Sequence, residues 1–445
     1  MILLVILLIG LIIVSFKNKV YGLGSYFLIR LCIPDTCRLG SLSFNTISLA
    51  IYVCILLVFY HGKINPNRTI LNKFQKQVLF LFGGIILLSF FALIVPLSYQ
   101  YKYLLQFFIT EFVPSLCILL VIGTEKEFKT LIKFIAAGAI FNCLYGIMTF
   151  FVDSNPIYDN LTSVSANELA MYDREEGRFG FARKAEGIYG KFNGKIMMTL
   201  ISLLIFTFFY NKKYLPSKTR YILLFSAFVV NILTSQRSGL FGIFAFIILL
   251  ADKKQIYGFL KKYGLLLGVC VILIMMIPEL KGFRDLFSSV FYMFDDKMQD
   301  KLGTSGSSVE MRISQFEMVW SMISTGILSG LGYAFDQYRG EFFKYDNEVL
   351  RGLESFFLKV LINTGILGVA LWIRFLLELV KPAYRIREML KNKYYFAYLT
   401  AYFVAILFTD ISGSFFLFLA FATLNLLEMQ FKGYYNGKQQ KKLIR

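Results

Sequence analysis

Arg237 stands in a very short polar turn, Ser235-Gln236-Arg237-Ser238-Gly239, between two long apolar runs. The planar guanidinium offers five N–H donors in a fork that matches phosphate oxygens, which lysine cannot copy. An arginine at the edge of an apolar segment must be solvated, reach toward water or pair with an anion. The turn therefore predicts an anion site at Arg237 with Ser235 and Ser238 beside it, against the alternative of an interfacial anchor.

Basic residues and glycines alternate in a second segment, 178–194, just before another apolar run. Glycines allow a backbone to approach a ligand closely, and a helix N-terminus suits phosphate oxygens. The candidate ligand-binding residues here are Arg183, Lys184, Lys191 and Asn193. The alternative is an ordinary charged loop that ends at a glycine-rich helix entry, and the residues alone leave both open.

A third group lies in a long polar stretch farther along the chain. Arg312 begins a segment of helical apolar periodicity that contains Trp320, and a glycine-rich turn then leads to Tyr333. Glu354 stands where the next apolar run opens. A carboxylate at such a helix mouth can act as a general base. It can also simply stabilise the positive helix N-terminus, which is what the residues alone favour.

The sequence gives little support for metal or thiol chemistry. No cluster of Cys, His or carboxylate residues has metal-ligand spacing, so the sequence predicts neither a metal nor another cofactor. The one histidine, His61, lies in a basic loop, where a solvated role is commoner than a catalytic one. Cys32 and Cys37 could form a local pair, which the sequence leaves open.

Long apolar runs are the elements that must position these residues. The 445 residues are 57% hydrophobic with a mean hydropathy of +0.62, too apolar for a soluble domain. Runs approaching the roughly 17–25 residues that cross a bilayer predict an all-α, polytopic transmembrane bundle of about twelve helices. The candidate spans are 1–16, 44–60, 78–96, 103–123, 129–152, 193–210, 219–234, 238–251, 264–278, 355–379, 394–409 and 414–430.

The N-terminal part is less regular. The run 1–16 has no basic residues before it and no clear cleavage site after it, so we interpret it as a retained helix rather than a signal peptide. The segment 22–34 is a short crossing, a re-entrant piece or an interfacial helix, since Arg30 makes a lipid-facing span costly.

The formal net charge of +19 would suggest nucleic acid in a soluble protein. Here the lysines and arginines gather in short loops, which is the positive-inside pattern, so we expect a lipid bilayer and no nucleic acid as partner. Counted from residue 44, the basic segments 63–76, 212–220, 253–262, 381–393 and 432–445 fall on one side, which is predicted to be cytoplasmic. If Lys17 and Lys19 lie there too, 22–34 crosses and the count becomes thirteen.

A single membrane domain over 1–445 is expected, with two long extracytoplasmic loops, 153–192 and the partly helical 279–354. Long loops in a bundle of otherwise short ones are usually functional. No internal repeat is visible and few charged residues lie deep in the spans, which argues against a transporter.

The order of these motifs resembles the O-antigen polymerase and O-antigen ligase superfamily of bacterial polysaccharide assembly. The shared features are the Arg- and Gly-bearing loop, the S-x-R-S-G turn, the Arg…Trp segment with G-x-G, and a polar residue followed by N-T-G-I-L-G. In sequence the resemblance is confined to about 180–195, 233–240, 310–335 and 354–368.

This resemblance implies a metal-independent membrane glycosyltransferase of GT-C-like fold, which takes a glycan from an undecaprenyl diphosphate carrier at the periplasmic face of the bacterial inner membrane. It implies that Arg237 holds the diphosphate, with Arg183 or Lys184 and Arg312 as partners, because preorganised cations stabilise a developing negative charge. The ligases carry a histidine, their suggested base, at the position of Glu354 in this chain. The difference favours a polymerase in which Glu354 activates the acceptor hydroxyl.

The sequence thus predicts a polymerase that joins undecaprenyl-diphosphate-linked repeat units into an O-antigen, capsule or exopolysaccharide. Its expected catalytic residues are Arg237, Arg312 and Glu354, and a chain-length regulator protein is a further candidate partner. The alternatives are ligase-type transfer to another acceptor, a transporter of lipid-linked sugars and a non-catalytic assembly subunit.

Overall fold

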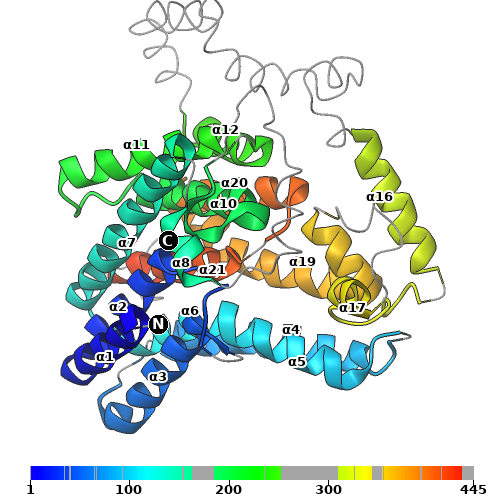
Figure 1. The fold of residues 1–445 in the computed structure, drawn as a ribbon, viewed down its shortest axis with the longest axis horizontal. Helices are drawn as coiled ribbons and strands as arrows, with labels where there is room; N and C mark the ends of the chain where they lie inside the picture. Colours follow the sequence, from blue (N-terminus) through cyan, green and yellow to red (C-terminus); the bar gives the residue numbers. More distant parts are fainter. Residues whose placement is uncertain are drawn as a thin grey trace, which may run out of the picture.

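The computed structural model describes residues 2–34, 36–39, 42–64, 66, 68–92, 94–152, 155–162, 185–234, 236–251, 309–324, 326–342, 353, 355–390, 393–411 and 413–432. Nearly all of these residues are helical, and the helices pack into one layered bundle (Figure 1). The helices are α1 Ile2–Lys17, α2 Lys19–Cys32, α3 Phe44–Phe59, η1 His61–Lys63, α4 Arg68–Ser89, α5 Leu97–Phe107, the π-helical η2 Phe108–Phe112, α6 Val113–Val121, α7 Glu125–Phe151, α8 Pro156–Leu161, η4 Gly187–Tyr189, α10 Lys191–Phe209, α11 Ser217–Leu233, α12 Arg237–Leu250, α16 Val309–Met322, α17 Phe335–Phe342, α19 Phe356–Leu390, α20 Tyr394–Phe408 and α21 Phe415–Phe431. The strands β1 Arg38–Leu39 and β2 Leu42–Ser43 pair as a short antiparallel hairpin.

Each expected span other than 264–278 overlaps a described helix. The expected span 264–278 lies outside the described residues, as do most of the loops 153–192 and 279–354. The bounds differ most at 78–96, where α4 begins ten residues earlier, at Arg68, and ends at Ser89. The apolar pattern marks the part of a helix that can face lipid, so it does not reveal a polar first turn.

Four described helical stretches are long and apolar enough to cross a membrane, namely Thr69–Ser89, Leu97–Val121, Glu125–Phe151 and Phe356–Pro382. Six shorter apolar helices accompany them. The chain is therefore a mostly helical membrane protein, but the expected count of about twelve crossings is not confirmed.

The α1–α2 turn lies at the same end of the bundle as the first basic loop. Asn18 caps α2 by accepting hydrogen bonds from the N–H groups of Val20 and Tyr21. The Lys19 ammonium then reaches the Lys63 carbonyl at 3.4 Å and the Glu127 carboxylate at 3.5 Å. This placement of Lys19 is the condition under which 22–34 was expected to cross. Cys32 and Cys37 are free thiols and do not form the pair that the sequence left open.

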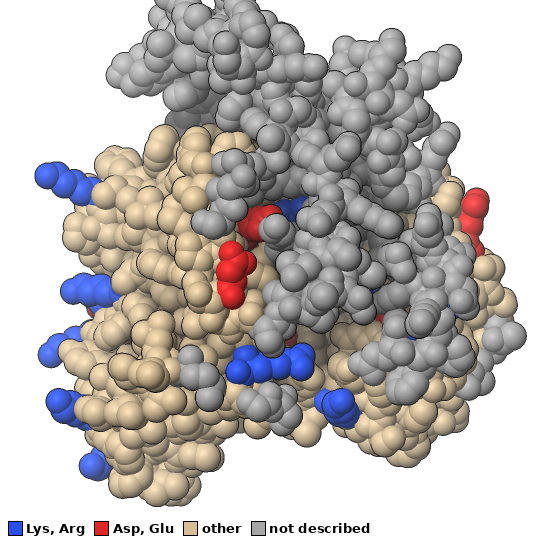
Figure 2. All heavy atoms as spheres, in the orientation of Figure 1, with Lys and Arg blue, Asp and Glu red and all other residues tan. Residues whose placement is uncertain are grey.

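Lysine and arginine side chains protrude along the left edge of the view in Figure 2. That edge holds α1 and α2 and one end each of α7 and α11 in Figure 1. The gathering of basic residues at one side of the described bundle agrees with the charge pattern of the sequence.

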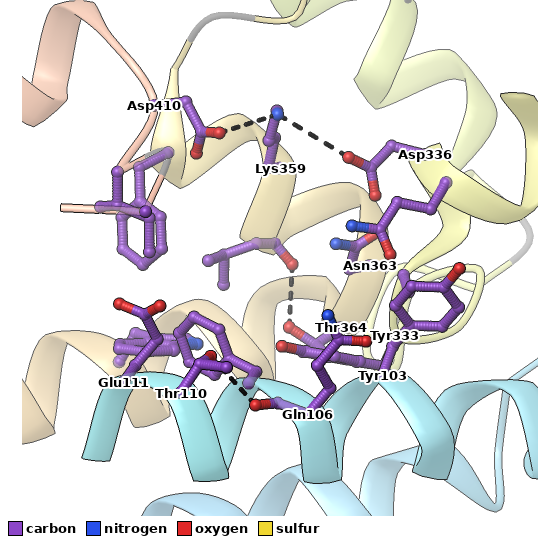
Figure 3. Close-up of a pocket in the computed structure, with 18 residues that line it drawn as sticks. Tyr103, Gln106, Thr110, Glu111, Tyr333, Asp336, Lys359, Asn363, Thr364 and Asp410 are labelled. Atoms are coloured by element: carbon purple, nitrogen blue, oxygen red, sulfur yellow. Dashed lines mark hydrogen bonds and ion pairs between the residues drawn. The ribbon is translucent and has the colours of Figure 1, made fainter. Parts of the chain in front are cut away.

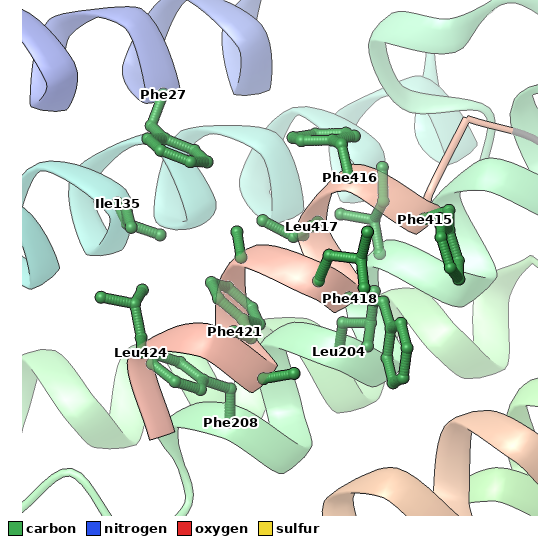
Figure 4. Close-up of a cluster of buried hydrophobic side chains, with 14 of the residues drawn as sticks. Phe27, Ile135, Leu204, Phe208, Phe415, Phe416, Leu417, Phe418, Phe421 and Leu424 are labelled. Atoms are coloured by element: carbon green, nitrogen blue, oxygen red, sulfur yellow. The ribbon is translucent and has the colours of Figure 1, made fainter. Parts of the chain in front are cut away.

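The core of the bundle is built around α21. Its first eight residues are all apolar, and thirteen of its seventeen residues are buried. A helix that is apolar all round is stable only where other helices enclose it. Phe421 stacks on Phe208 of α10 with ring centroids 4.0 Å apart, and Phe418 stacks on Tyr402 of α20 at 4.2 Å. Figure 4 shows α21 running through the centre of this aromatic cluster.

A buried charge pair joins α2 to η2. Arg30 and Glu111 are 3.9 Å apart, and their side chains are only 4% and 7% exposed. The Arg30 guanidinium lies 4.4 Å from the centroid of the Phe416 ring, and the Phe416 N–H donates to Glu111 at 2.6 Å. Arg30 therefore faces the interior of the bundle rather than lipid, which removes the objection to a helix over 22–34.

We expect Arg30→Met to destabilise the protein by about 3–5 kcal/mol, because Glu111 would be left as a buried charge without its partner. The melting temperature in detergent should fall, and the double variant Arg30→Met/Glu111→Gln should recover part of the loss. Lys129→Met, which removes the exposed pair with Glu125, is the matched control and should change stability by about 0–1 kcal/mol. An Arg30→Met protein that melts with the native one would contradict the structural role of the pair.

Candidate functional site

The site is organised by a break in α19. Gly365 has φ +64°, which interrupts the helix after Thr364. In a regular helix the N–H groups of Ile366 and Leu367 would donate to the carbonyls of Ile362 and Asn363. Here they donate instead to Ile327 and Leu328 of the preceding loop, at 3.0 and 3.3 Å.

The same loop satisfies the two carbonyls that the break leaves open. The Leu331 N–H donates to the Ile362 carbonyl at 2.9 Å, and the Gly332 N–H donates to the Asn363 carbonyl at 3.1 Å. Backbone groups inside a membrane protein must be paired, so non-helical backbone persists only where protein or a polar cavity supplies partners. The loop and the broken helix therefore stabilise each other.

Glycine is required where the two backbones meet. A Cβ atom on Gly365 would lie 2.5 Å from both the carbonyl carbon and the carbonyl oxygen of Leu328. A Cβ atom on Gly330, whose φ is +70°, would lie 2.6 Å from the Gly365 nitrogen. The glycines of the G-x-G turn and of the N-T-G motif thus serve a close approach of one backbone to the other.

Two amide side chains orient the residues that follow the loop. Gln100 of α5 accepts from the Tyr333 N–H at 2.8 Å and donates to the Val95 carbonyl at 2.8 Å. The Asn363 side-chain oxygen accepts from the Phe335 N–H at 3.0 Å. Between these anchors Ala334 has φ +63°, a conformation that a non-glycine residue adopts only where its surroundings impose it.

A polar cavity of about 270 Å³ opens beside this junction (Figure 3). The lining side chains combine three carboxylates and one ammonium with hydroxyl, amide and aromatic groups. They come from α5 and η2, the start of α17, the first half of α19 and the loop after α20. They are Tyr103, Gln106, Phe107, Thr110, Glu111, Tyr333, Ala334, Asp336, Gln337, Phe356, Lys359, Val360, Asn363, Thr364, Trp372, Asp410, Ile411 and Gly413.

Charges of opposite sign face each other across this cavity. The Lys359 ammonium lies 2.9 Å from Asp410 and 3.7 Å from Asp336. Figure 3 shows Glu111 across the cavity from this triad, beside Thr110 and Gln106. Burial and then the nearby carboxylates raise the pKa of Tyr333 well above its ordinary value, so its phenol keeps its proton and remains a donor at neutral pH.

The two segments that the sequence assigned to phosphate binding are brought together at the start of α10 and α12. The Ala185 N–H donates to the Leu233 carbonyl at 3.1 Å, and the Thr199 hydroxyl donates to Thr234 at 2.7 Å. The Gly239 α-carbon faces Thr199, since a Cβ atom there would lie 2.5 Å from the threonine methyl group. Neighbouring placement of these segments is what a shared anion site requires.

The turn that carries Arg237 and the polar cavity also lie at the same end of the bundle. Phe241 lies one helical turn after Arg237. Its ring packs in a tilted orientation against the ring of Phe408, with centroids 5.4 Å apart. Phe408 ends α20 two residues before Asp410 of the cavity. The basic start of α4 lies at the opposite end, because α4 runs antiparallel to α19, with Phe80 against Arg374 and Gly84 against Leu371.

The structure describes some of the predicted site residues and not others. Arg237 begins α12, Ser238 follows it and is buried, and Tyr333 lines the cavity. Lys191 and Asn193 lie in the first turn of α10 and Arg312 in the first turn of α16, but their side chains lie outside the described part. Arg183, Lys184, Ser235 and Glu354 also lie outside the described residues.

Sequence reasoning missed several polar residues that line or adjoin these sites. The sequence analysis gave no role to four charged residues of the cavity lining, which are Glu111, Asp336, Lys359 and Asp410. Lys195 was also overlooked, although it is only 8% exposed and lies one turn before Thr199 on α10. The available signal for Glu111 and Lys195 was an isolated charge within an apolar run.

Residues 222–373 match the family described as O-antigen ligase. The match begins in α11 and ends in α19, so it contains the Arg237 turn, the G-x-G loop and the break at Gly365. The resemblance to the O-antigen polymerase and ligase superfamily is thus confirmed over these residues. The match suggests an O-antigen polymerase or ligase type of activity, which is glycosyltransferase-like, for this membrane protein. No curated protein matches the chain.

We expect Gly365→Ala to destabilise the protein by about 1–3 kcal/mol or more, because the new methyl group meets backbone atoms at a positive φ. Gly83→Ala is the matched control, since a Cβ atom at that position of α4 meets nothing within 4 Å. It should leave the melting temperature unchanged or raise it slightly, because alanine is the better helix former. Equal melting temperatures for the two variants would contradict the close approach at Gly365.

Proposed function

We propose that the protein is a polysaccharide polymerase that joins lipid-diphosphate-linked oligosaccharide repeat units at the outer face of the bacterial cytoplasmic membrane. The observation that carries the proposal is the contact between the Arg237 turn and α10. The Arg237 turn itself lies within the residues that match the O-antigen ligase family. This juxtaposition supports the proposal, because an arginine and a helix N-terminus both suit the oxygens of a diphosphate.

In the proposed reaction an acceptor hydroxyl attacks the anomeric carbon of the lipid-linked glycan. The new C–O bond forms as the bond to the diphosphate breaks, and the bonding electrons leave with the diphosphate. Arg237, with Arg183 or Lys184 and Arg312, would stabilise this charge. Lys191, Asn193, Ser235, Ser238 and Tyr333 would bind diphosphate or glycan, and Glu354 would take the proton of the acceptor hydroxyl.

Ligase-type transfer to another acceptor is the second candidate. The family description itself favours it. The glutamate at position 354, where the ligases carry a histidine, favours the polymerase.

The product of the reaction separates the candidates. Purified protein in lipid would receive a lipid-linked repeat unit without added metal, and the products would be resolved by length. A ladder of longer lipid-linked chains is expected. Glycan transferred only to a different acceptor would identify a ligase, and translocation without new glycosidic bonds would identify a transporter.

In the same assay Arg237→Ala should lower the rate by about 10²- to 10³-fold, the usual loss when one preorganised donor to a developing charge is removed. Arg220→Ala removes a cation from the opposite end of α11 and should leave the rate unchanged. Polymerisation at the native rate by Arg237→Ala would refute the role of this arginine.

Glu354→Gln tests the base separately. A general base contributes about 10²- to 10⁴-fold, so the rate should fall by that factor while binding of the lipid-linked substrate persists. Rates should be followed over pH 5–9. A variant as fast as the native enzyme at every pH would remove Glu354 as the base.

A further inference from the structure

We propose that the polar cavity between η2 and the broken helix α19 binds one sugar residue without negative charge, as the acceptor end of the glycan. The inference rests on the proposed function, since it assigns the cavity to that enzyme's glycan. It goes further by naming a subsite and its selectivity.

The charge of the cavity excludes the phosphate end of the substrate. Among the described residues that line it, Glu111, Asp336 and Asp410 contribute three carboxylates against the one ammonium of Lys359. Arg30 stands behind Glu111 and is not part of this lining, and counting it still leaves more carboxylates than cations in the described part of the site. An anionic group placed here would meet like charges in a partly desolvated site, which is strongly unfavourable.

The remaining lining groups suit a pyranose ring. A sugar presents hydroxyl donors and acceptors around its edge and C–H groups on its faces. The cavity offers neutral partners of both kinds in Gln106, Thr110 and Asn363, and the phenol of Tyr333 as a donor. Phe356 and Trp372 supply apolar faces, and their rings meet edge to face with centroids 5.1 Å apart. A few fixed polar groups against apolar walls are typical of a small-molecule site.

The size and position of the cavity agree with one sugar at a time. Its volume of about 270 Å³ lies near the lower limit of small-molecule pockets. The cavity lies at the same end of the bundle as Arg237, since Phe408 links the start of α12 to the loop of Asp410. A cationic subsite for the diphosphate and an acidic subsite for an uncharged sugar would therefore serve opposite sides of one reaction.

The two tryptophans of the chain allow a direct test, because Trp372 lines the cavity and Trp320 lies elsewhere, on α16. In the Trp320→Phe protein, tryptophan fluorescence reports on Trp372 alone. We would titrate it with uncharged methyl pyranosides of glucose, galactose, mannose and N-acetylglucosamine, and with methyl glucuronide as the matched acid.

At least one uncharged glycoside should give a saturable change, and the glucuronide should bind at least about tenfold more weakly, a difference of about 1.4 kcal/mol. Trp372→Phe, which retains only Trp320, should show no change with either sugar. No saturable response to any uncharged glycoside, or glucuronide binding as tight as that of the best one, would overturn the proposal.

Charge variants test the origin of the selectivity. Asp336→Asn and Asp410→Asn, each made in the Trp320→Phe background, should reduce the discrimination against glucuronide to below about threefold. Glu125→Gln, an exposed carboxylate at the start of α7, should leave it unchanged. Unaltered discrimination in both cavity variants would refute the electrostatic explanation.

The sugar-binding test and the polymerisation assay have separate outcomes, so one proposal can be rejected without the other. Sugar binding without a product ladder would reject the polymerase and leave the subsite intact. A ladder without sugar binding would do the reverse.

Discussion

The exchange of backbone hydrogen bonds between the loop 326–334 and the break in α19 is the interaction on which the candidate site depends. Two N–H groups and two carbonyls of α19 find partners on the loop instead of within the helix. An unpaired backbone group in an apolar environment costs several kcal/mol, so neither partner can hold its conformation alone. The exchange carries the chain directly to Tyr333 and Asp336 and leaves the cavity beside the opened helix.

Charge pairs tie this junction to the rest of the bundle. Lys359 of α19 joins Asp336, which follows the loop, to Asp410, which follows α20. Arg30 of α2 holds Glu111, and Glu111 in turn accepts from the first turn of α21. At the other end Lys212 pairs with Glu428 and reaches Asn425 at 2.8 Å. Each pair connects elements far apart in sequence, and removing Arg30 from its pair would leave Glu111 as a buried charge.

The helices were largely predictable from the sequence, whereas the site was predictable only in part. Apolar runs located most of the long described helices, because burial in lipid or in the bundle demands them, but the short helices α8 and α17 were not predicted. The Arg237 turn and the segment before α10 could be recognised as related only through the resemblance, yet the structure places them side by side. Glu111 could not be assigned, since a lone carboxylate in the run 103–123 does not show that Arg30 lies opposite it. The broken helix was also hidden, because Gly365 acts through Leu328, on a different element.

The division of charge at the end of the bundle that holds Arg237 and the polar cavity bears on how the proposed enzyme would keep its two substrates apart. A leaving diphosphate and an attacking hydroxyl need opposite environments, one that stabilises growing negative charge and one that does not attract a phosphate. Cations alone would bind the diphosphate of either lipid-linked glycan at either position. Carboxylates that line the acceptor cavity penalise the wrong orientation, because specificity is a difference between two binding free energies and repulsion contributes to it as much as attraction. In this arrangement Lys359 has a distinct role. It contacts both Asp336 and Asp410 and limits their mutual repulsion, and in the proposed subsite the three carboxylates would still disfavour an anion.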